Sequence, residues 1–181
     1  MSSPGLPRVL TVEPLDTKDS KWLKLVKINY EDAHGKPRTW EAMKRPTRPK
    51  SSAVDAIQIL AILEKPTGPE VLLEKQFRPP TGKIVVEFPA GMVDEGETPE
   101  QAAVRELREE TGYVGEVLED ITRPVHWNEL EEGEIIDTFS VPLKDLYSEV
   151  RRLSAEGFAI DGKVGSFAEA LETANVWQSS L

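Results

Sequence analysis

The stretch GMVDEGETPEQAAVRELREETGY, residues 91–113, reads as a short helix that gathers many acids. Glu106, Glu109 and Glu110 are spaced at i, i+3 and i+4, which places their carboxylates on one side of a helix. Like charges at these spacings repel one another and destabilise an isolated helix. The three acids therefore need a compensating partner.

Residues at both ends of this stretch predict where the helix begins and ends. Thr98 suits the N-cap, Pro99 suits the first helical position, and Gln101 completes a capping box. Gly112 can end the helix in the left-handed conformation. At about 100° per residue, the side expected to pack against a sheet comprises Ala103, Val104, Leu107 and Thr111.

Two interpretations of the acidic side remain open. Most runs of charge are solvated surface. However, these acids lie largely in the second half of the helix, where the macrodipole disfavours negative charge, and Arg105 and Arg108 are the only nearby cations in the sequence. Carboxylates at this spacing can share a hard cation such as Mg²⁺, which prefers oxygen ligands. The pattern therefore favours a metal site over a solvated face.

The chain outside this helix alternates between strand patterns, turns and helix patterns. Residues 21–45 alternate on both sides of the turn AHGK and predict a β-hairpin. Further strands are expected over 53–63, 71–78, 84–91 and 133–143, and helices over 143–153, with Gly157 as the C-cap, and 167–176. Mixed strands flanked by helices indicate a layered α/β or α+β domain with a mixed sheet.

Composition narrows the class of protein. The chain has 181 residues and a formal net charge of −10, which argues against a general binder of nucleic acid or of anionic membranes. It has no cysteine and two histidines, so disulfides and thiolate metal sites are excluded and a zinc site is disfavoured. The sequence has neither an apolar run that could span a bilayer nor the apolar core of a signal peptide. The expected location is the cytoplasm, with the nucleus as an alternative.

The helical stretch also carries a family resemblance. Gly91, five residues, Glu97, seven residues and then RELREETGY is similar to the signature of the Nudix hydrolases, Gly-x5-Glu-x7-Arg-Glu-apolar-x-Glu-Glu-x-Gly-apolar. Every fixed position is matched, with Tyr113 at the last apolar place. The resemblance implies an α/β/α sandwich and the hydrolysis of nucleoside diphosphates linked to another moiety.

The resemblance also implies roles for residues of the signature. Mg²⁺, or alternatively Mn²⁺, with roughly two to three ions per site, would be bound by Ala90 through its main-chain carbonyl and by Glu106, Glu109 and Glu110. Arg105 would hold the acids in place and, with Glu109 and Glu110, would belong to the catalytic group. Gly91, Glu97 and Gly112 would have structural roles.

Flanking residues resemble one branch of that family. KQFRPPTGKIVVEFPAG, residues 75–91, and GKPRTWEAMKR, residues 35–45, are similar to the ADP-sugar pyrophosphatases, which cleave ADP-ribose. In that branch an N-terminal β-subdomain, here residues 1–50, exchanges across a homodimer, and residues 51–181 would form the Nudix domain. The implied substrate is ADP-ribose or a related ADP-sugar, cleaved to AMP and a sugar phosphate.

The same likeness implies which residues contact this substrate. They are Trp22, Trp40, Glu41, Arg45, Arg78 and Met92, with the two tryptophans, one from each subunit, enclosing the adenine. Other interpretations remain open. Trp22 and Trp40, one on each strand of the predicted hairpin, would otherwise be core residues or interface anchors, and Arg78 would otherwise form a surface ion pair.

The segment that follows the signature is short. Residues 114–131 hold no second pair of strands, which predicts a sheet reduced at this edge and weaker closure over the substrate. Glu134, in the next loop EEGE, resembles the general base of the branch and would otherwise be a solvated acid. His126 and Trp127 have no assigned role. If the short segment prevents turnover, the chain would be an ADP-ribose-binding module. A third hypothesis is a Nudix hydrolase for another nucleoside diphosphate derivative.

Overall fold

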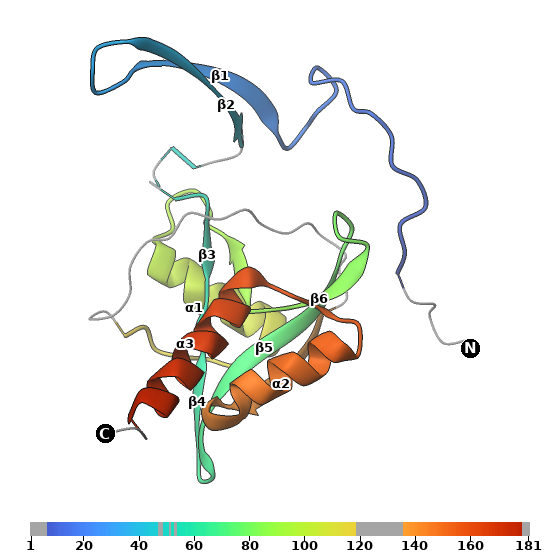
Figure 1. Ribbon diagram of the computed structural model, residues 1–181, viewed down its shortest axis with the longest axis vertical. Helices are drawn as coiled ribbons and strands as arrows, with labels where there is room; N and C mark the ends of the chain where they lie inside the picture. Colours follow the sequence, from blue (N-terminus) through green and yellow to red (C-terminus); the bar gives the residue numbers. More distant parts are fainter. Residues whose placement is uncertain (1–6, 47–48, 51, 53, 119–135, 179–181) are drawn as a thin grey trace.

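The computed structural model describes residues 7–46, 49, 50, 52, 54–118 and 136–178. Among these residues, a mixed sheet of five strands lies at the centre of the main body (Figure 1). Its strands are β4 (Ile62–Lys65), β5 (Gly68–Arg78), β6 (Lys83–Glu87), β8 (Ile136–Pro142) and β9 (Ala159–Ile160). β5 pairs antiparallel with β4, β6 and β8, and β6 pairs parallel with β9. The long strand β5 therefore organises the sheet.

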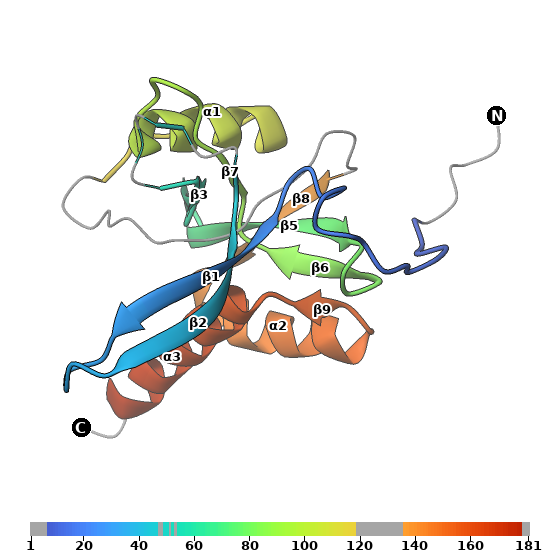
Figure 2. The same cartoon turned by 90° about the horizontal axis from the view of Figure 1, so that it is seen from above.

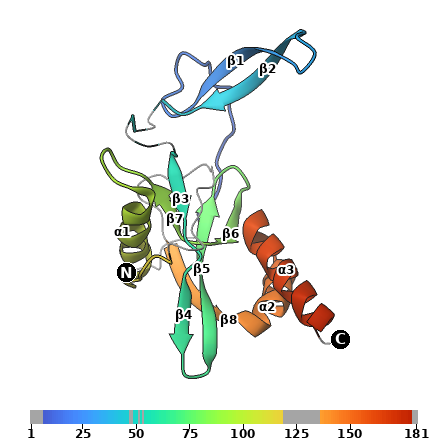
Figure 3. The same ribbon diagram turned by 90° about the vertical axis from the view of Figure 1, so that its left-hand side faces the viewer.

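The sheet separates two layers of helices (Figure 3). Helix α1 (Pro99–Thr111) lies on one side, and α2 (Leu146–Ala155) and α3 (Gly162–Gln178) lie on the other. Because side chains alternate along a strand, Val71 and Leu73 of β5 pack with α2 and α3, whereas Leu72 and Glu74 point to the opposite face. The expected α/β/α sandwich is confirmed.

Two segments that were predicted as continuous strands are broken. Residues 53–63 contain β3 (Ala56–Gln58) and the start of β4, and residues 84–91 contain most of β6 and the start of β7 (Ala90–Met92). β3 and β7 pair antiparallel in a small sheet of their own. The second break falls at Pro89, which has no backbone N–H to donate to a strand ladder. Its carbonyl accepts from the Ile59 N–H at 2.8 Å, and the chain then turns to place β7 against α1.

The N-terminal hairpin is confirmed and forms a sheet of its own (Figure 2). β1 (Lys24–Glu31) pairs antiparallel with β2 (Pro37–Lys44). Asp32 shapes the turn, because its carboxylate accepts from the backbone N–H groups of His34 and Lys36 at 2.9 and 3.0 Å. Trp40 lies on β2, but Trp22 precedes β1, since pairing begins at Lys24. The expectation of a tryptophan on each strand is therefore wrong.

Capping residues define α1 as predicted. The Thr98 hydroxyl accepts from the Gln101 backbone N–H, and the Gln101 side chain accepts from the Thr98 N–H, which completes the capping box. At the other end, Gly112 adopts a left-handed conformation with φ of 75°. Both ends satisfy backbone groups that a helix leaves unpaired.

The buried side of α1 differs from the predicted one. Ala102 and Leu107 are buried, whereas Ala103, Val104 and Thr111 are only partly buried. Ala102 packs with a small cluster beneath the helix that also contains Val54, Val93 and Ile57. Which side of α1 is buried depends on its position over β3 and β7. The spacing of residues along the helix does not predict that position.

Helices α2 and α3 cover the other face of the sheet. The apolar residues of α2 recur at helical spacing and are buried, namely Leu146, Val150 and Leu153. Gly157, with φ of 98°, follows the end of α2. α3 begins at Gly162 rather than at the predicted Phe167. The Asp161 carboxylate accepts from the Lys163 N–H at 3.0 Å and so stabilises an earlier first turn.

Several predictions fall outside the described residues. Residues 119–135 contain Glu134, His126 and Trp127 and most of the segment in which the sheet was expected to be reduced. These expectations therefore stay predictions. No helix in the described part of the chain combines the length and the apolar character needed to cross a membrane.

Candidate active site

The Glu106 side chain of α1 fills the space beside Gly91 of β7 that a Cβ atom would need. A Cβ atom on Gly91 would lie 2.0 Å from Glu106 Cδ and 2.2 Å from its Oε1. Both distances are far shorter than any van der Waals contact. The missing side chain therefore lets the Glu106 carboxylate lie directly against β7, next to the buried Ala90.

We expect Gly91→Ala to destabilise the protein, because the new methyl group would displace the Glu106 side chain from its place against β7 and from its bond with Arg105. Overpacking of this kind costs about 1–3 kcal/mol in the free energy of unfolding, measurable as a lower midpoint of thermal unfolding. Gly165→Ala in α3 is the control, because its Cβ would meet nothing closer than 4.0 Å and alanine is favoured over glycine within a helix, so its midpoint should not fall. Equal unfolding midpoints for the two variants would contradict the close approach.

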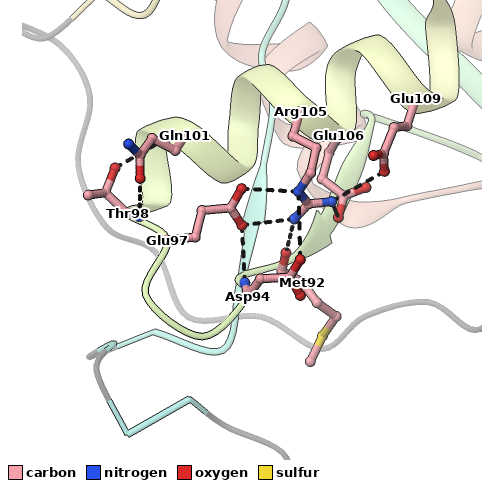
Figure 4. A network of polar contacts seen from close by, with 8 residues as sticks. All are labelled: Met92, Asp94, Glu97, Thr98, Gln101, Arg105, Glu106 and Glu109. Carbon is pink, nitrogen blue, oxygen red and sulfur yellow. Dashed lines mark hydrogen bonds and ion pairs between the residues drawn. The ribbon is translucent and has the colours of Figure 1, made fainter.

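Arg105 lies at the centre of a polar network that joins α1 to the preceding loop (Figure 4). Its Nε and Nη2 atoms donate to the two carboxylate oxygens of Glu97 at 3.0 and 2.9 Å. Nη1 donates to Glu106 Oε1 at 2.7 Å and to Glu109 Oε2 at 3.3 Å. Nη2 also donates to the Met92 carbonyl at 2.8 Å. One guanidinium group therefore connects the backbone of β7, the loop and two acids of the helix.

The same network shifts the pKa values of its members. Hydrogen bonding to Arg105 lowers the pKa of Glu97, and hydrogen bonding to Glu97 raises the pKa of Arg105. Burial raises the pKa of Glu106; Arg105 opposes this effect, whereas Glu109 and Glu97 add to it. A single arginine is shared among three acids, so the partly buried Glu106 carboxylate is in a position suited to a further positive charge.

The other predicted metal ligands lie on the same stretch of α1 and on β7. The Ala90 N–H donates to Glu110 Oε2 at 3.2 Å, and the Glu109 side chain is 59% exposed. Within the described residues, no three acidic or histidine side chains converge on a point where they could hold a metal ion. Protein donors occupy oxygen atoms of Glu106 and Glu110 instead.

The donor atoms nevertheless fit a hard divalent cation in type. Carboxylates from α1 and the main-chain carbonyl of Ala90 are all oxygen donors, which Mg²⁺ and Mn²⁺ prefer. The close approach at Gly91 and the incomplete neutralisation of Glu106 fit such an ion as well. The coordination set itself stays a prediction.

Arg78 is bound by a buried acid that the sequence analysis did not single out. Arg78 Nε and Nη2 donate to Glu87 Oε1 and Oε2 at 2.9 and 3.0 Å. Glu87 is buried, which raises its pKa, while Arg78 acts in the opposite direction. An acid at the end of the otherwise apolar run IVVE was the available signal. The predicted contact of Arg78 with substrate stays a prediction.

The residues expected to bind the nucleotide lie in two places. Trp22 and Trp40 are 54% and 63% exposed, and Glu41 on β2 is exposed too. The two tryptophans therefore form no hairpin core. Arg45, which follows β2, donates from Nη1 to Met92 Sδ at 4.0 Å, so this residue lies beside the loop that Arg105 holds.

A surface cavity of about 710 Å³ flanks α1. It is lined by Glu100, Gln101, Val104, Arg105, Arg108, Glu109 and Val117. Only Arg105 and Glu109 are shared with the network above. The cavity therefore adjoins the candidate site and does not contain it.

Comparison with known proteins shows which family the chain resembles. The model of the NUDIX domain matches residues 55–156, more than half of the chain. An uncharacterized Nudix hydrolase from Schizosaccharomyces pombe is 41% identical, with coverage of 99% of this chain and 100% of that protein. An ADP-sugar pyrophosphatase from Mus musculus is 37% identical, with coverage of 96% and 91%. An ADP-ribose pyrophosphatase from Saccharomyces cerevisiae is 37% identical, with coverage of 86% and 79%.

These alignments also bear on the length of the chain. The alignment with the Schizosaccharomyces pombe protein spans 206 positions, whereas this chain has 181 residues. That relative therefore has residues without a counterpart here. The family match, the high coverage and the acids gathered around Gly91 agree, and the chain belongs to the Nudix hydrolase family.

Proposed function

We propose that the protein hydrolyses the diphosphate bond of ADP-ribose, or of a related ADP-sugar, and releases AMP and a sugar phosphate. The observation that carries this proposal is the network in which Arg105 binds Glu97, Glu106 and Glu109, with Glu106 lying against Gly91 of β7. Two relatives with 37% identity are named ADP-sugar and ADP-ribose pyrophosphatases. Their names support the substrate class, and the oxygen donors of α1 and β7 support the binding of the cations that a diphosphate requires.

We propose that Ala90, through its carbonyl, and Glu106, Glu109 and Glu110 bind the divalent cations, roughly two to three Mg²⁺ ions with Mn²⁺ as a substitute. When bound, such ions neutralise the charge of a diphosphate and acidify an attacking water. Arg105 keeps the acids in place, since it is bonded to Glu97 in the loop and to both Glu106 and Glu109. Glu134 is proposed to accept the proton of the attacking water on its carboxylate.

The first test is product formation by the full chain. Purified protein is incubated with ADP-ribose and Mg²⁺, and nucleotides are separated by anion-exchange chromatography. We expect AMP and ribose 5-phosphate in equal amounts, and no release when EDTA is present. A panel with an ADP-hexose, a dinucleotide and a sugar nucleotide of another base ranks the substrates. Faster cleavage of a non-adenine nucleotide would contradict the proposed substrate class.

The hairpin supports a proposal of a shared site in a homodimer. Ile28 and Trp40 are cross-strand partners, so their side chains share one face of the hairpin, and Tyr30 lies on the same face two residues further on. All three are exposed, and a contiguous exposed apolar face is typical of an interface. We propose that the hairpins of two copies exchange, so that Trp22 and Trp40 of different copies enclose the adenine. A monomer in light scattering would contradict this arrangement.

We expect Trp40→Ala to raise KM for ADP-ribose roughly 10-fold or more, because stacking contributes about 1–3 kcal/mol per base. Trp22→Ala should act in the same direction, with kcat less affected in both variants. Steady-state kinetics with AMP as the measured product checks this. Leu25→Ala is the control, since it removes an exposed apolar side chain from the opposite face of the hairpin. The same rise in KM for all three variants would indicate general damage to the hairpin and no stacking role.

A further inference from the structure

An ion pair between β5 and β6 lies outside the Nudix signature and close to the candidate site. Arg78 ends β5 and Glu87 ends β6. The guanidinium meets both carboxylate oxygens, with Nε to Oε1 at 2.9 Å and Nη2 to Oε2 at 3.0 Å. Two parallel hydrogen bonds restrict the plane of a guanidinium as well as its position. Glu87 therefore determines how Arg78 is oriented.

Stability alone does not explain an ion pair with so little exposure. The side chains of Arg78 and Glu87 are 21% and 10% exposed. The fully buried Glu74 is the cross-strand partner of Glu87, so two acids oppose each other near one arginine. A buried ion pair is often no more stabilising than apolar side chains of similar volume. This arrangement indicates a role in addition to packing.

The ion pair faces the layer that contains α1. Val86 packs with α2 and α3, so its neighbour Glu87 points to the other side of the sheet. The chain reaches Ala90 three residues later, where the backbone N–H donates to Glu110. Arg78 and Glu87 therefore lie on the same side of the sheet as the acids of the signature, immediately before β7.

We propose that Glu87 is a positioning residue, whose carboxylate holds the Arg78 guanidinium in the orientation in which it meets the phosphate oxygens of the substrate. This inference rests on the proposed function, because it requires a diphosphate at the α1 site. Arginine suits the task, since its planar fork matches phosphate oxygens. A guanidinium that is already ordered also loses less side-chain entropy when the substrate binds. Glu87 itself makes no contact with the substrate.

The test is a double-mutant cycle with Glu87→Gln, Arg78→Lys and the double variant. We expect Glu87→Gln to lower kcat/KM for ADP-ribose roughly 10- to 100-fold, the range for a lost charge-assisted hydrogen bond, mainly through KM. Arg78→Lys keeps the charge, loses the fork and should show a loss of similar size. If Glu87 acts through Arg78, the double variant is no worse than Arg78→Lys alone.

Two further variants separate orientation from folding. Glu87→Asp keeps the buried charge but withdraws the carboxylate by one methylene, so it should fold and still show a raised KM. Glu149→Gln breaks a similar two-point pair with Arg152 on α2, with distances of 2.8 and 2.6 Å, and should leave both kcat and KM unchanged. Circular dichroism at the assay temperature verifies that each variant is folded.

Two results would overturn the inference. One is a double variant whose loss equals the product of the single losses. The other is a Glu87→Asp variant with the KM of the parent protein. That result would mean that Glu87 only balances the charge of Arg78 and does not orient it. An active parent protein with either result removes only this inference. A parent protein that releases no AMP from ADP-ribose removes the proposed function and this inference together.

Discussion

Glu110→Gln is expected to lower kcat for ADP-ribose roughly 10²- to 10⁴-fold, the range for loss of a group that acts in the chemical step. The amide has nearly the volume of the carboxylate but carries no negative charge for a divalent cation. It also places an N–H₂ group or a neutral oxygen opposite the Ala90 N–H, which donates to Glu110 at 3.2 Å in the parent protein. Rates over a range of Mg²⁺ concentrations check the expectation, and half-saturation should require more metal.

Glu100→Gln provides the control for this variant. Glu100 lies in the first turn of the same helix and is exposed. Its substitution by Gln removes the same charge from the protein. We expect its kcat to stay within about twofold of the parent value, as is usual for a surface substitution away from the reacting groups. AMP release at the parent rate by Glu110→Gln would remove this acid from the mechanism.

Arg105→Ala is expected to have the largest effect on stability. Its guanidinium is the shared hydrogen-bond donor to Glu97, Glu106 and the Met92 carbonyl. Removal of one partner of a buried ion pair costs about 3–5 kcal/mol. We expect about 2–3 kcal/mol here, because 28% of the Arg105 side chain is exposed and water screens part of the interaction. Thermal and urea unfolding measure the loss in the free energy of unfolding.

The loss should depend on pH in a defined direction. The pKa of Glu97 lies below its ordinary value of 4.5 in the folded protein, chiefly because of Arg105. The corresponding stability is therefore fully present above about pH 4.5 and disappears as the pH falls through the lowered value. The difference between the parent protein and Arg105→Ala should shrink in the same window.

Arg108→Ala is the control for Arg105→Ala. Arg108 is exposed on the same helix, and its loss changes the net charge equally. We expect a change in the free energy of unfolding within about 0.5 kcal/mol. Equal destabilisation by the two variants would show that the helix needs positive charge in general, and the network around Arg105 would then lose its assigned importance.

Features set by neighbours in the sequence could be predicted. The capping box joins Thr98 to Gln101, three residues away, and Asp32 shapes the hairpin turn through residues two and four positions later. Such hydrogen bonds form within one turn of chain and depend little on the rest of the fold. For the same reason, both ends of α1 and the hairpin were predicted from the sequence.

Features that depend on distant segments could not be predicted in this way. Glu87 and Arg78 are nine residues apart, and they meet only because β5 and β6 pair in the observed register. The strand expected over 53–63 is broken, because its first part pairs with β7 and its last part with β5. Ala102 is buried in place of Val104, because β3 and β7 lie beneath that side of α1.

The sequence by itself determined the family, the limits of the acidic helix and the three acids on one of its sides, because these follow from residue spacing along one helix. Only the tertiary structure decided which oxygen atoms meet which donors. Arg105 binds Glu97, Glu106 and Met92 together, and Glu106 lies against Gly91. The spacing of residues in the sequence determines the directions in which their side chains leave the helix axis. It predicts neither the distance from the helix to the next strand nor the register of that strand. Those two quantities decide whether an acid is buried, paired or open to a cation.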